Sequence, residues 1–150
     1  MEIIWESKYF EELTADELYG LLRLREQVFI IEQNCVYPDL DNKDQKAIHI
    51  FGKSDGEIIA YSRVFKSGDY FETASIGRVV THKNFRNQKI GYHLMQKSIT
   101  EVRTRFNEDF ITISAQSYLL GFYENLGFKP VGEEYLEDGI PHKRMIRKGG

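Results

Sequence analysis

One run near the middle of the chain is Ser75-Ile-Gly-Arg-Val-Val-Thr-His-Lys-Asn-Phe-Arg-Asn-Gln-Lys-Ile-Gly-Tyr-His-Leu-Met95. It predicts a strand, then a short polar turn, then an amphipathic helix. The helix begins near Gly91, and the turn before it carries Arg86, Asn87, Gln88 and Lys89. Backbone N–H groups at a helix start, beside positive side chains, suit a phosphate or pyrophosphate. The run therefore predicts a site for a phosphate-bearing molecule.

The composition fits one folded domain over residues 1–150. Of the 150 residues, 41% are apolar and 13% aromatic, which is enough for a core. The formal net charge of −3 argues against binding nucleic acid through bulk charge. Cys35 is the one cysteine, so no internal disulfide can form. No apolar run approaches the roughly 20 residues of a membrane span, and no secretory signal is recognised. We therefore expect a cytoplasmic protein that binds neither nucleic acid nor a membrane.

Hydrophobic periodicity predicts alternating strands and helices around the central run. Thr14 and Glu17 form a capping box before a helix whose apolar series includes Arg25. The other expected helices are Ile90–Phe106 and Ser117–Leu126, the latter ended by Gly127. The expected strands are Met1–Glu6, Ala47–Phe51, Glu57–Phe65, Thr73–His82, Phe110–Ala115, Phe128–Tyr135 and His142–Arg147. Their order predicts an α/β fold, with a mixed sheet and helices packed on it.

Two motifs stand in order in the second half of the chain. The first is Arg86-Asn-Gln-Lys-Ile-Gly91, and the second is Phe122-Tyr-Glu-Asn-Leu-Gly-Phe128. Together they resemble the signature of the GNAT superfamily of acyl-CoA N-acyltransferases, except that Lys89 stands where a glycine is usual. The resemblance implies a single GNAT domain, built as a mixed, mostly antiparallel sheet flanked by helices.

Other segments resemble the ElaA-type branch of this superfamily. They are Arg25-Glu-Gln-Val-Phe29, Glu32-Gln-Asn-Cys35, Tyr37-Pro-Asp-Leu-Asp41 and the stretch from Pro130 to His142. The resemblance implies acetyl-CoA as acyl donor, a small-molecule or peptide amine as acceptor, direct attack in a ternary complex, and no metal. The resemblance leaves open whether the protein forms a homodimer, because pairing through sheet edges or tails is common in similar folds.

The resemblance also assigns roles to individual residues. Backbone groups of the 79–81 strand pair with the pantetheine arm and polarise the thioester carbonyl, while the 86–91 turn holds the pyrophosphate. Tyr123 matches the general acid that protonates the leaving thiolate, and Gln116 replaces a donor-binding asparagine. The donor-binding residues implied are Val79, Val80, Thr81, Arg86, Asn87, Gln88, Lys89, Ile90, Gly91 and Gln116.

The general base is open. Some relatives carry a glutamate twelve residues before the tyrosine, and here that position is Ile111, which cannot accept a proton. A water chain is one alternative. The candidate side chains are Glu32, His49, Glu72 and His142, of which His142 and Glu32 lie in segments matched to the ElaA-type branch.

Two further features have competing interpretations. Asp39, Asp41 and Asp44 do not follow the EF-hand pattern, because Lys43 takes a ligand position. We expect a solvated acidic loop there, and a sharper hypothesis is that the loop attracts a cationic amine. For Cys35, a packed thiol is favoured over a nucleophile, because no paired base is evident.

Two other functions stay open. One is a non-catalytic module that senses an acyl-CoA, which the absence of the family glutamate slightly favours, whereas Tyr123 and the open motif argue against it. The other is an acyltransferase like the acyl-homoserine-lactone synthases, whose Arg-x-x-Val-Phe pattern resembles Arg25–Phe29. The chain is short for that second family, and its later motifs fit the ElaA type better.

Overall fold

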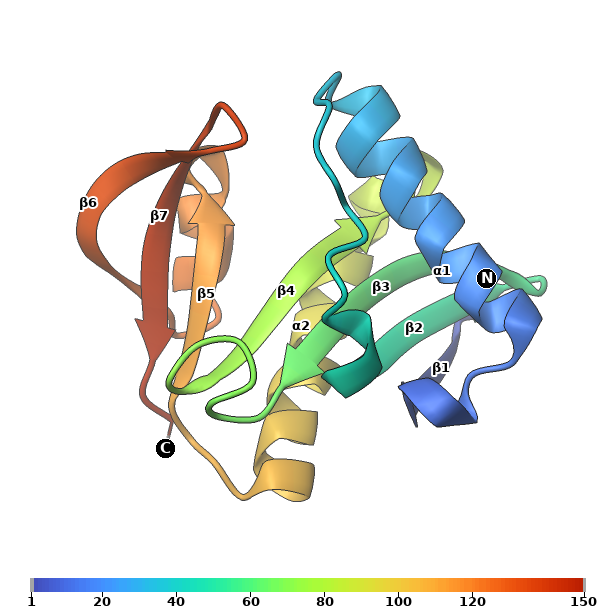
Figure 1. The fold of residues 1–150 in the computed structure, drawn as a ribbon, viewed down its shortest axis with the longest axis horizontal. Coiled ribbons are helices and arrows are strands. Elements are labelled where there is room, and N and C mark those ends of the chain that lie inside the picture. The colour runs from blue at the N-terminus through green and yellow to red at the C-terminus, as the bar shows by residue number, and fades with distance from the viewer. Residues whose placement is uncertain (1, 150) are drawn as a thin grey trace.

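A seven-stranded sheet in the order β1-β2-β3-β4-β5-β7-β6 forms the centre of the molecule (Figure 1). The computed structural model describes residues 2–149, apart from the side chain of Asn87. The strands are β1 (Ile4–Tyr9), β2 (Ile48–Ser54), β3 (Glu57–Phe65), β4 (Ala74–Thr81), β5 (Ile111–Gln116), β6 (Lys129–Glu137) and β7 (Ile140–Arg147). All neighbours pair antiparallel except β4 and β5, which confirms a mixed, mostly antiparallel sheet.

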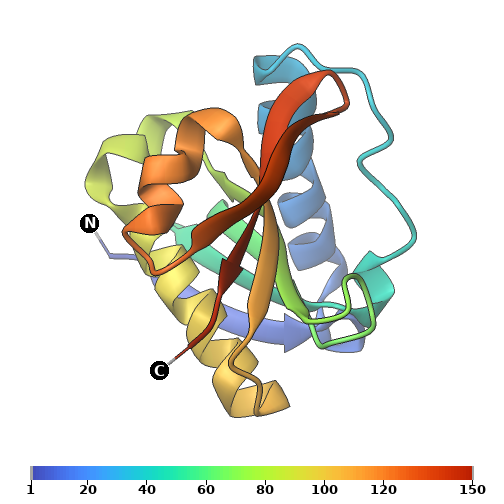
Figure 2. The same cartoon turned by 90° about the vertical axis from the view of Figure 1, so that its left-hand side faces the viewer.

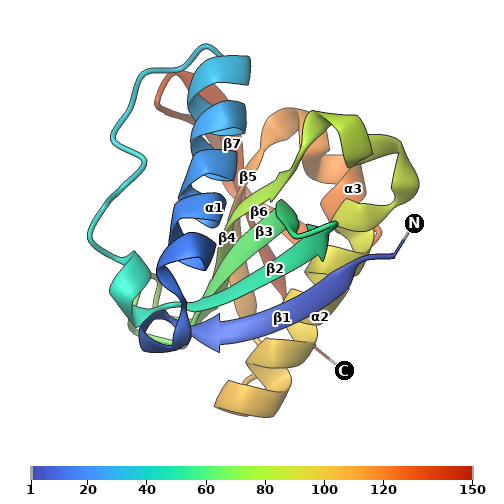
Figure 3. The same ribbon diagram turned by 90° about the vertical axis from the view of Figure 1, so that its right-hand side faces the viewer.

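Helices cover both faces of the sheet. Figures 2 and 3 show α1 (Ala15–Arg25) on one face, with α2 (Ile90–Phe106) and α3 (Leu120–Glu124) on the other. Leu21 and Leu24 of α1 pack in one apolar cluster, and α2 contributes Leu94, Met95 and Val102 to the larger one. No helix in residues 2–149 is both long and apolar enough to cross a membrane.

The predicted boundaries agree with the structure where local pattern decides them. The ends of β3 and α2 match, and Gly127 has a φ of +93° where the predicted last helix stops. The first strand runs later than predicted, because β1 pairs with β2 from Ile4 opposite Lys53 to Tyr9 opposite Ile48. The region predicted as Ser117–Leu126 divides into a 3₁₀ turn and the short α3.

The chain continues from α1 into a π-helical segment over Glu26–Glu32. Two hydrogen bonds with i→i+5 spacing mark its end, from Gln33 N to Val28 O at 3.1 Å and from Cys35 N to Ile30 O at 3.1 Å. The wider π-helical turn rotates the following side chains relative to a regular α-helix, and such segments are frequent at functional sites. This segment borders the cavity described below.

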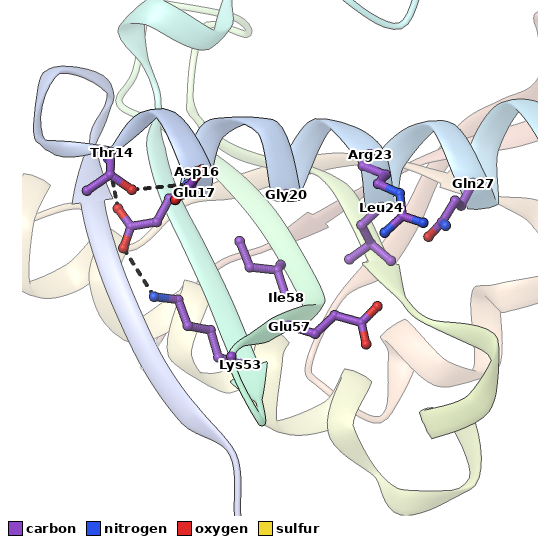
Figure 4. A pocket seen from close by; sticks show the side chains of 11 residues that line it. Thr14, Asp16, Glu17, Gly20, Arg23, Leu24, Gln27, Lys53, Glu57 and Ile58 are labelled. Atoms are coloured by element: carbon purple, nitrogen blue, oxygen red, sulfur yellow. Dashed lines mark hydrogen bonds and ion pairs between the residues drawn. The ribbon is translucent and has the colours of Figure 1, made fainter.

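The start of α1 is fixed by the predicted capping box (Figure 4). The Thr14 hydroxyl accepts a bond from Glu17 N at 3.1 Å, and Thr14 N donates to the Glu17 carboxylate at 2.9 Å. Lys53 adds an ion pair to Glu17 at 3.2 Å. These groups line a hollow of about 400 Å³ between α1 and the β2–β3 hairpin. None of the predicted site residues lines this hollow.

Replacing Thr14 by alanine removes the cap and should lower the free energy of unfolding by about 1 kcal/mol. Thr14→Ser keeps the hydroxyl and should stay close to the wild type. Urea unfolding followed by circular dichroism measures both variants. An equal loss in the serine and alanine variants would contradict a capping role for the hydroxyl.

Candidate active site

Two neighbouring strands in the middle of the sheet, β4 and β5, separate after a short contact. They pair only from Ala74 to Ile111 and from Ser75 to Thr112, and Figure 1 shows them diverging toward their carboxyl ends. On its other side β4 stays paired with β3 as far as Thr81. The edge of β4 beyond Ser75 therefore carries backbone groups that no neighbouring strand occupies.

A β-bulge lies within this open edge. Arg78 and Val79 together oppose the single residue Ser62 of β3, and Arg78 has a φ of +51°. Bulges re-aim a strand and are frequent beside functional sites. Here the bulge lies on the stretch of β4 that no longer pairs with β5.

A cavity of about 920 Å³ occupies one end of the gap. Its walls come from the π-helical segment, the end of β4, the turn before α2, the end of β5, and α3. Among the donor-binding residues predicted from the sequence, it brings together Val79, Val80, Thr81, Arg86, Lys89, Gly91 and Gln116. Gln88 and Ile90 do not line it, and the side chain of Asn87 lies outside the described structure.

The turn before α2 is built to expose a helix start. Lys89, at the N-cap of α2, has a φ of +57°, a left-handed conformation that costs a non-glycine residue roughly 1–2 kcal/mol. This explains why a glycine is usual at that position. At Gly91, an added Cβ would meet Phe122 at 3.6 Å and the Thr81 hydroxyl at 3.7 Å, ordinary contact distances. The chain's own packing does not require this glycine, so its effect is to leave room beside the cavity.

Arg86 is bound within the protein. Its guanidinium forms a two-pronged ion pair with the Glu32 carboxylate, and Arg86 Nε donates to the Thr81 carbonyl at 3.1 Å. The hydrogen bonds from Arg86 lower the pKa of Glu32 below its ordinary value. Glu32 is therefore a weakened proton acceptor, and the ion pair joins the π-helical segment to the turn before α2.

Tyr123 lies at the junction of two cavities. Its ring, 6% exposed, packs edge-on against Phe122 and Phe128, with centroids 5.0 Å and 6.0 Å away. Burial raises the pKa of Tyr123 above its ordinary value, so the phenol stays protonated at neutral pH. A smaller cavity of about 110 Å³ lies on the other side. The two share the lining residues Phe29, Gln33, Val79, Gln116, Leu119 and Tyr123, so they meet in the gap between β4 and β5.

The four base candidates have very different positions. His142 is buried and lines the smaller cavity, whereas Glu32 lines the larger one in its ion pair with Arg86. His49 is completely buried and bonds to the Tyr61 hydroxyl at 2.6 Å and to the Asp44 carbonyl at 2.8 Å. Glu72 is exposed and lines neither cavity. Of the two histidines, only His142 is near the gap.

The prediction of a solvated acidic loop at Asp39, Asp41 and Asp44 is wrong. Asp39 and Asp44 are buried and bind Arg25 at 2.8 Å and 2.9 Å. Arg63 holds Asp41 with both terminal nitrogens and also reaches Asp44 at 3.0 Å. These carboxylates are neutralised inside the protein, which also removes the basis for their attracting a cationic amine.

Arg78 ties the bulge of β4 to the same loop. Its Nε lies 2.8 Å from Asp39 Oδ1, and its guanidinium stacks 5.6 Å from the centre of the Tyr37 ring. Sequence reasoning missed this cluster of three arginines and three aspartates. One signal was available, because Arg25 falls on the apolar face of its helix, where an arginine needs a buried partner.

Cys35 lies next to the hairpin between β6 and β7. Its thiol donates to the Asp138 carbonyl at 3.3 Å, and the residue is half-buried and lines the smaller cavity. The hairpin turn itself consists of Asp138 and Gly139, with φ values of +50° and +79°. The contact brings the loop after the π-helical segment against this turn.

A sequence model of the acetyltransferase (GNAT) domain matches residues 11–148. The chain belongs to the GNAT acetyltransferase family. This confirms the family indicated by the two motifs. The GNAT membership supports transfer of an acyl group from an acyl-CoA to an amine.

Relatives with known structures agree with this GNAT assignment. The protein ElaA of Escherichia coli (strain K12) is 40% identical over 148 residues, which cover 97% of both chains. The crystal structure of Escherichia coli ElaA has a TM-score of 0.91 and covers 97% of this chain and 99% of ElaA. An acyl-CoA N-acyltransferase from Pseudomonas aeruginosa reaches the same TM-score of 0.91 at 36% identity, covering 97% and 99%.

A more distant structure shares the fold alone. It is an aminoglycoside 6'-N-acetyltransferase complexed with coenzyme A, with a TM-score of 0.71 at 15% identity, covering 95% of this chain and 96% of that protein. The ElaA-type resemblance read from the sequence is thus confirmed at the level of sequence and fold.

The buried ion pairs predict how the stability of this GNAT domain depends on pH. Burial alone would raise the pKa of Asp41, but the hydrogen bonds and charge of Arg63 outweigh it and hold this pKa at about 2. Because the folded-state pKa is depressed, the stabilisation is complete above about pH 4 and is lost as the pH falls toward 2. Asp41→Asn should flatten the slope of unfolding free energy against pH in that window.

Urea unfolding at a series of pH values measures the slope. Glu57→Gln, at an exposed carboxylate, is the matched control and should keep the wild-type slope. If Asp41→Asn and the wild type lose stability in parallel, Asp41 does not carry this dependence.

Proposed function

We propose that this protein transfers an acetyl group from acetyl-CoA to a primary amine by direct attack in a ternary complex. The observation that carries the proposal is the open edge of β4 beside the start of α2, with Gly91 leaving room between them. A long, thin donor with a pyrophosphate needs both features, a polar backbone edge for its arm and a helix start for its phosphates.

The donor's pyrophosphate would bind where α2 begins. The 17-residue helix directs its first N–H groups and the positive end of its dipole toward that point. Lys89 and Arg86 line the same cavity and add positive charge. Since Arg86 already holds Glu32, its contribution depends on exchanging one anionic partner for another.

The thioester would lie along the bulged edge of β4. Backbone N–H groups of Val79 to Thr81 are the donors available to an oxyanion that forms as the amine attacks. The new C–N bond forms, the C–S bond breaks, and the sulfur leaves as a thiolate that must gain a proton. The apolar wall around Tyr123 disfavours both negatively charged forms, the phenolate and the thiolate. Because burial disfavours both anions, a proton can pass from the Tyr123 hydroxyl to the sulfur.

Calorimetric titration with acetyl-CoA tests the donor site, and Gly91→Ala sharpens the test. The new methyl group meets no protein atom closer than 3.6 Å, so the variant should keep or gain stability, by up to about 1 kcal/mol. It should nevertheless weaken acetyl-CoA binding about tenfold, which is about 1.4 kcal/mol.

Gly121→Ala is the matched control, because it lies in a helix with no atom within 4 Å of the added Cβ and does not line the cavity. It should leave the affinity unchanged. Wild-type protein that fails to bind acetyl-CoA would rule out the proposed function.

Tyr123→Phe tests the general acid. Loss of the phenolic proton should lower kcat by about 100-fold, the lower range for a positioned acid or base, while the calorimetric affinity for acetyl-CoA stays within about twofold. Steady-state assay of thiol release with a panel of amines measures the effect. Tight donor binding without turnover of any amine would instead favour a binding module, and an unchanged kcat would remove Tyr123 from the reaction.

A further inference from the structure

The smaller cavity is bounded by the β6–β7 hairpin, which supplies a carboxylate and an imidazole from neighbouring strands. His142 Nε2 lies 3.5 Å from Glu137 Oε2, and both residues line the cavity. His142 is buried, whereas the side chain of Glu137 is 45% exposed. The imidazole thus faces the interior of the gap, and the carboxylate lies toward its mouth.

The hydrogen bond on the far side of the ring fixes the tautomer of His142. Its Nδ1 lies 2.7 Å from the Ile140 carbonyl oxygen, which can only accept, so Nδ1 carries the hydrogen. In the neutral ring, Nε2 is then an acceptor that faces a second acceptor, Glu137 Oε2. Two acceptors that converge in this way suit a group with several N–H donors and a positive charge.

Both groups are held by further partners. Glu137 Oε1 accepts a bond from the Ser114 hydroxyl at 3.0 Å, and that hydroxyl also bonds to Tyr135 OH. The Tyr135 ring stacks on His142, with 6.2 Å between centroids and 25° between planes. The second carboxylate oxygen of Glu137 is thereby directed toward the imidazole.

The balance of charge around this pair is negative. The other titratable side chains that line the cavity or pack on the pair are Cys35, Tyr37, Arg78, Tyr123, Tyr135 and Asp138, and Arg63 lines a neighbouring cavity together with Glu137. The two positive groups, Arg78 and Arg63, are held by Asp39 at 2.8 Å and by Asp41 at 2.6 Å. Glu137 and Asp138 are therefore left to set the charge at the mouth.

We propose that the acceptor's ammonium group binds between Glu137 and His142, and that the acceptor is a cationic amine with no carboxylate next to the reacting nitrogen. His142 Nε2 accepts a proton from the ammonium, and Glu137 binds the ammonium and stabilises the imidazolium. Glu32 lines the larger cavity and not the smaller one, so it lies outside this acceptor site. The inference rests on the proposed acetyl transfer.

The protons balance across the reaction. The ammonium gives one proton to His142, and the neutral amine attacks the thioester carbon. The adduct's nitrogen loses a second proton, which restores the Tyr123 hydroxyl after that hydroxyl has protonated the thiolate. The products are an N-substituted acetamide and the free thiol, and one proton leaves from His142 to water.

The first test follows the imidazole signals by NMR as a function of pH. The chain has 4 histidines, and the signal lost in His142→Gln identifies the relevant one. Glu137→Gln removes the carboxylate 3.5 Å from Nε2, which favours the imidazolium, so the His142 signals should change at a lower pH than in the wild type. The exposed Glu133 of the same strand provides the control, and Glu133→Gln should leave the titration unchanged. Identical titration in Glu137→Gln and wild type would overturn the pairing.

The second test compares ethylamine with alanine, which differs from it by one carboxylate beside the amine. The wild type should use ethylamine with a kcat/KM at least about tenfold above that for alanine. Glu137→Gln should lose most of this preference and retain its acetyl-CoA affinity, whereas Glu133→Gln should match the wild type. Equal use of the two amines by the wild type would overturn the assigned acceptor class.

The two proposals fail in different experiments. Absence of acetyl-CoA binding in the calorimeter overturns the proposed function, whatever the histidine does. Normal acetyl-CoA binding with an unperturbed His142 titration in Glu137→Gln overturns only the acceptor site. A shifted titration and an unchanged preference between the amines would confine the Glu137–His142 pair to a structural role.

Discussion

The pairing of β4 with β5 over only two residue pairs is the constraint on which the site depends. A fully paired sheet would bury these edges in its own hydrogen bonds and leave no route from one face to the other. Because the strands separate after Ser75, the start of α2, the end of β5 and the π-helical segment can all border one gap. The bulge at Arg78 lies in β4 beyond the last residue that pairs with β5.

The cluster of buried arginines and aspartates explains how a loop without regular structure keeps its place over the sheet. Moving charges out of water is expensive, and removing one partner of a buried pair leaves the other charge uncompensated. The segment between Asn34 and Lys43 therefore has few alternative positions. Through Asp39 it is bound both to α1 by Arg25 and to the bulge by Arg78, so ion pairs join the wall of the smaller cavity to the edge of β4.

Local patterns in the sequence predict the helices and strands well. They predict poorly which side chains pair across long distances in the sequence. The capping box at Thr14, both ends of α2 and the turn before it follow from residues within a few positions of each other. The ion pairs between distant residues do not, because Arg63 lies 22 residues from Asp41 and Arg86 lies 54 from Glu32. The π-helical continuation of α1 was also beyond prediction, since its apolar spacing is close to that of an α-helix.

The ion pair between Glu32 and Arg86 has a thermodynamic consequence for a ternary complex. One guanidinium cannot bind a carboxylate and a pyrophosphate equally well, so a donor that recruits Arg86 loosens the π-helical segment. That segment supplies Phe29 to both cavities, and Gln33 follows directly after it. Occupancy of one cavity therefore changes the free energy of filling the other, and linkage requires the change to be equal in both directions. The coupling between the two ligands thus depends on a single surface salt bridge.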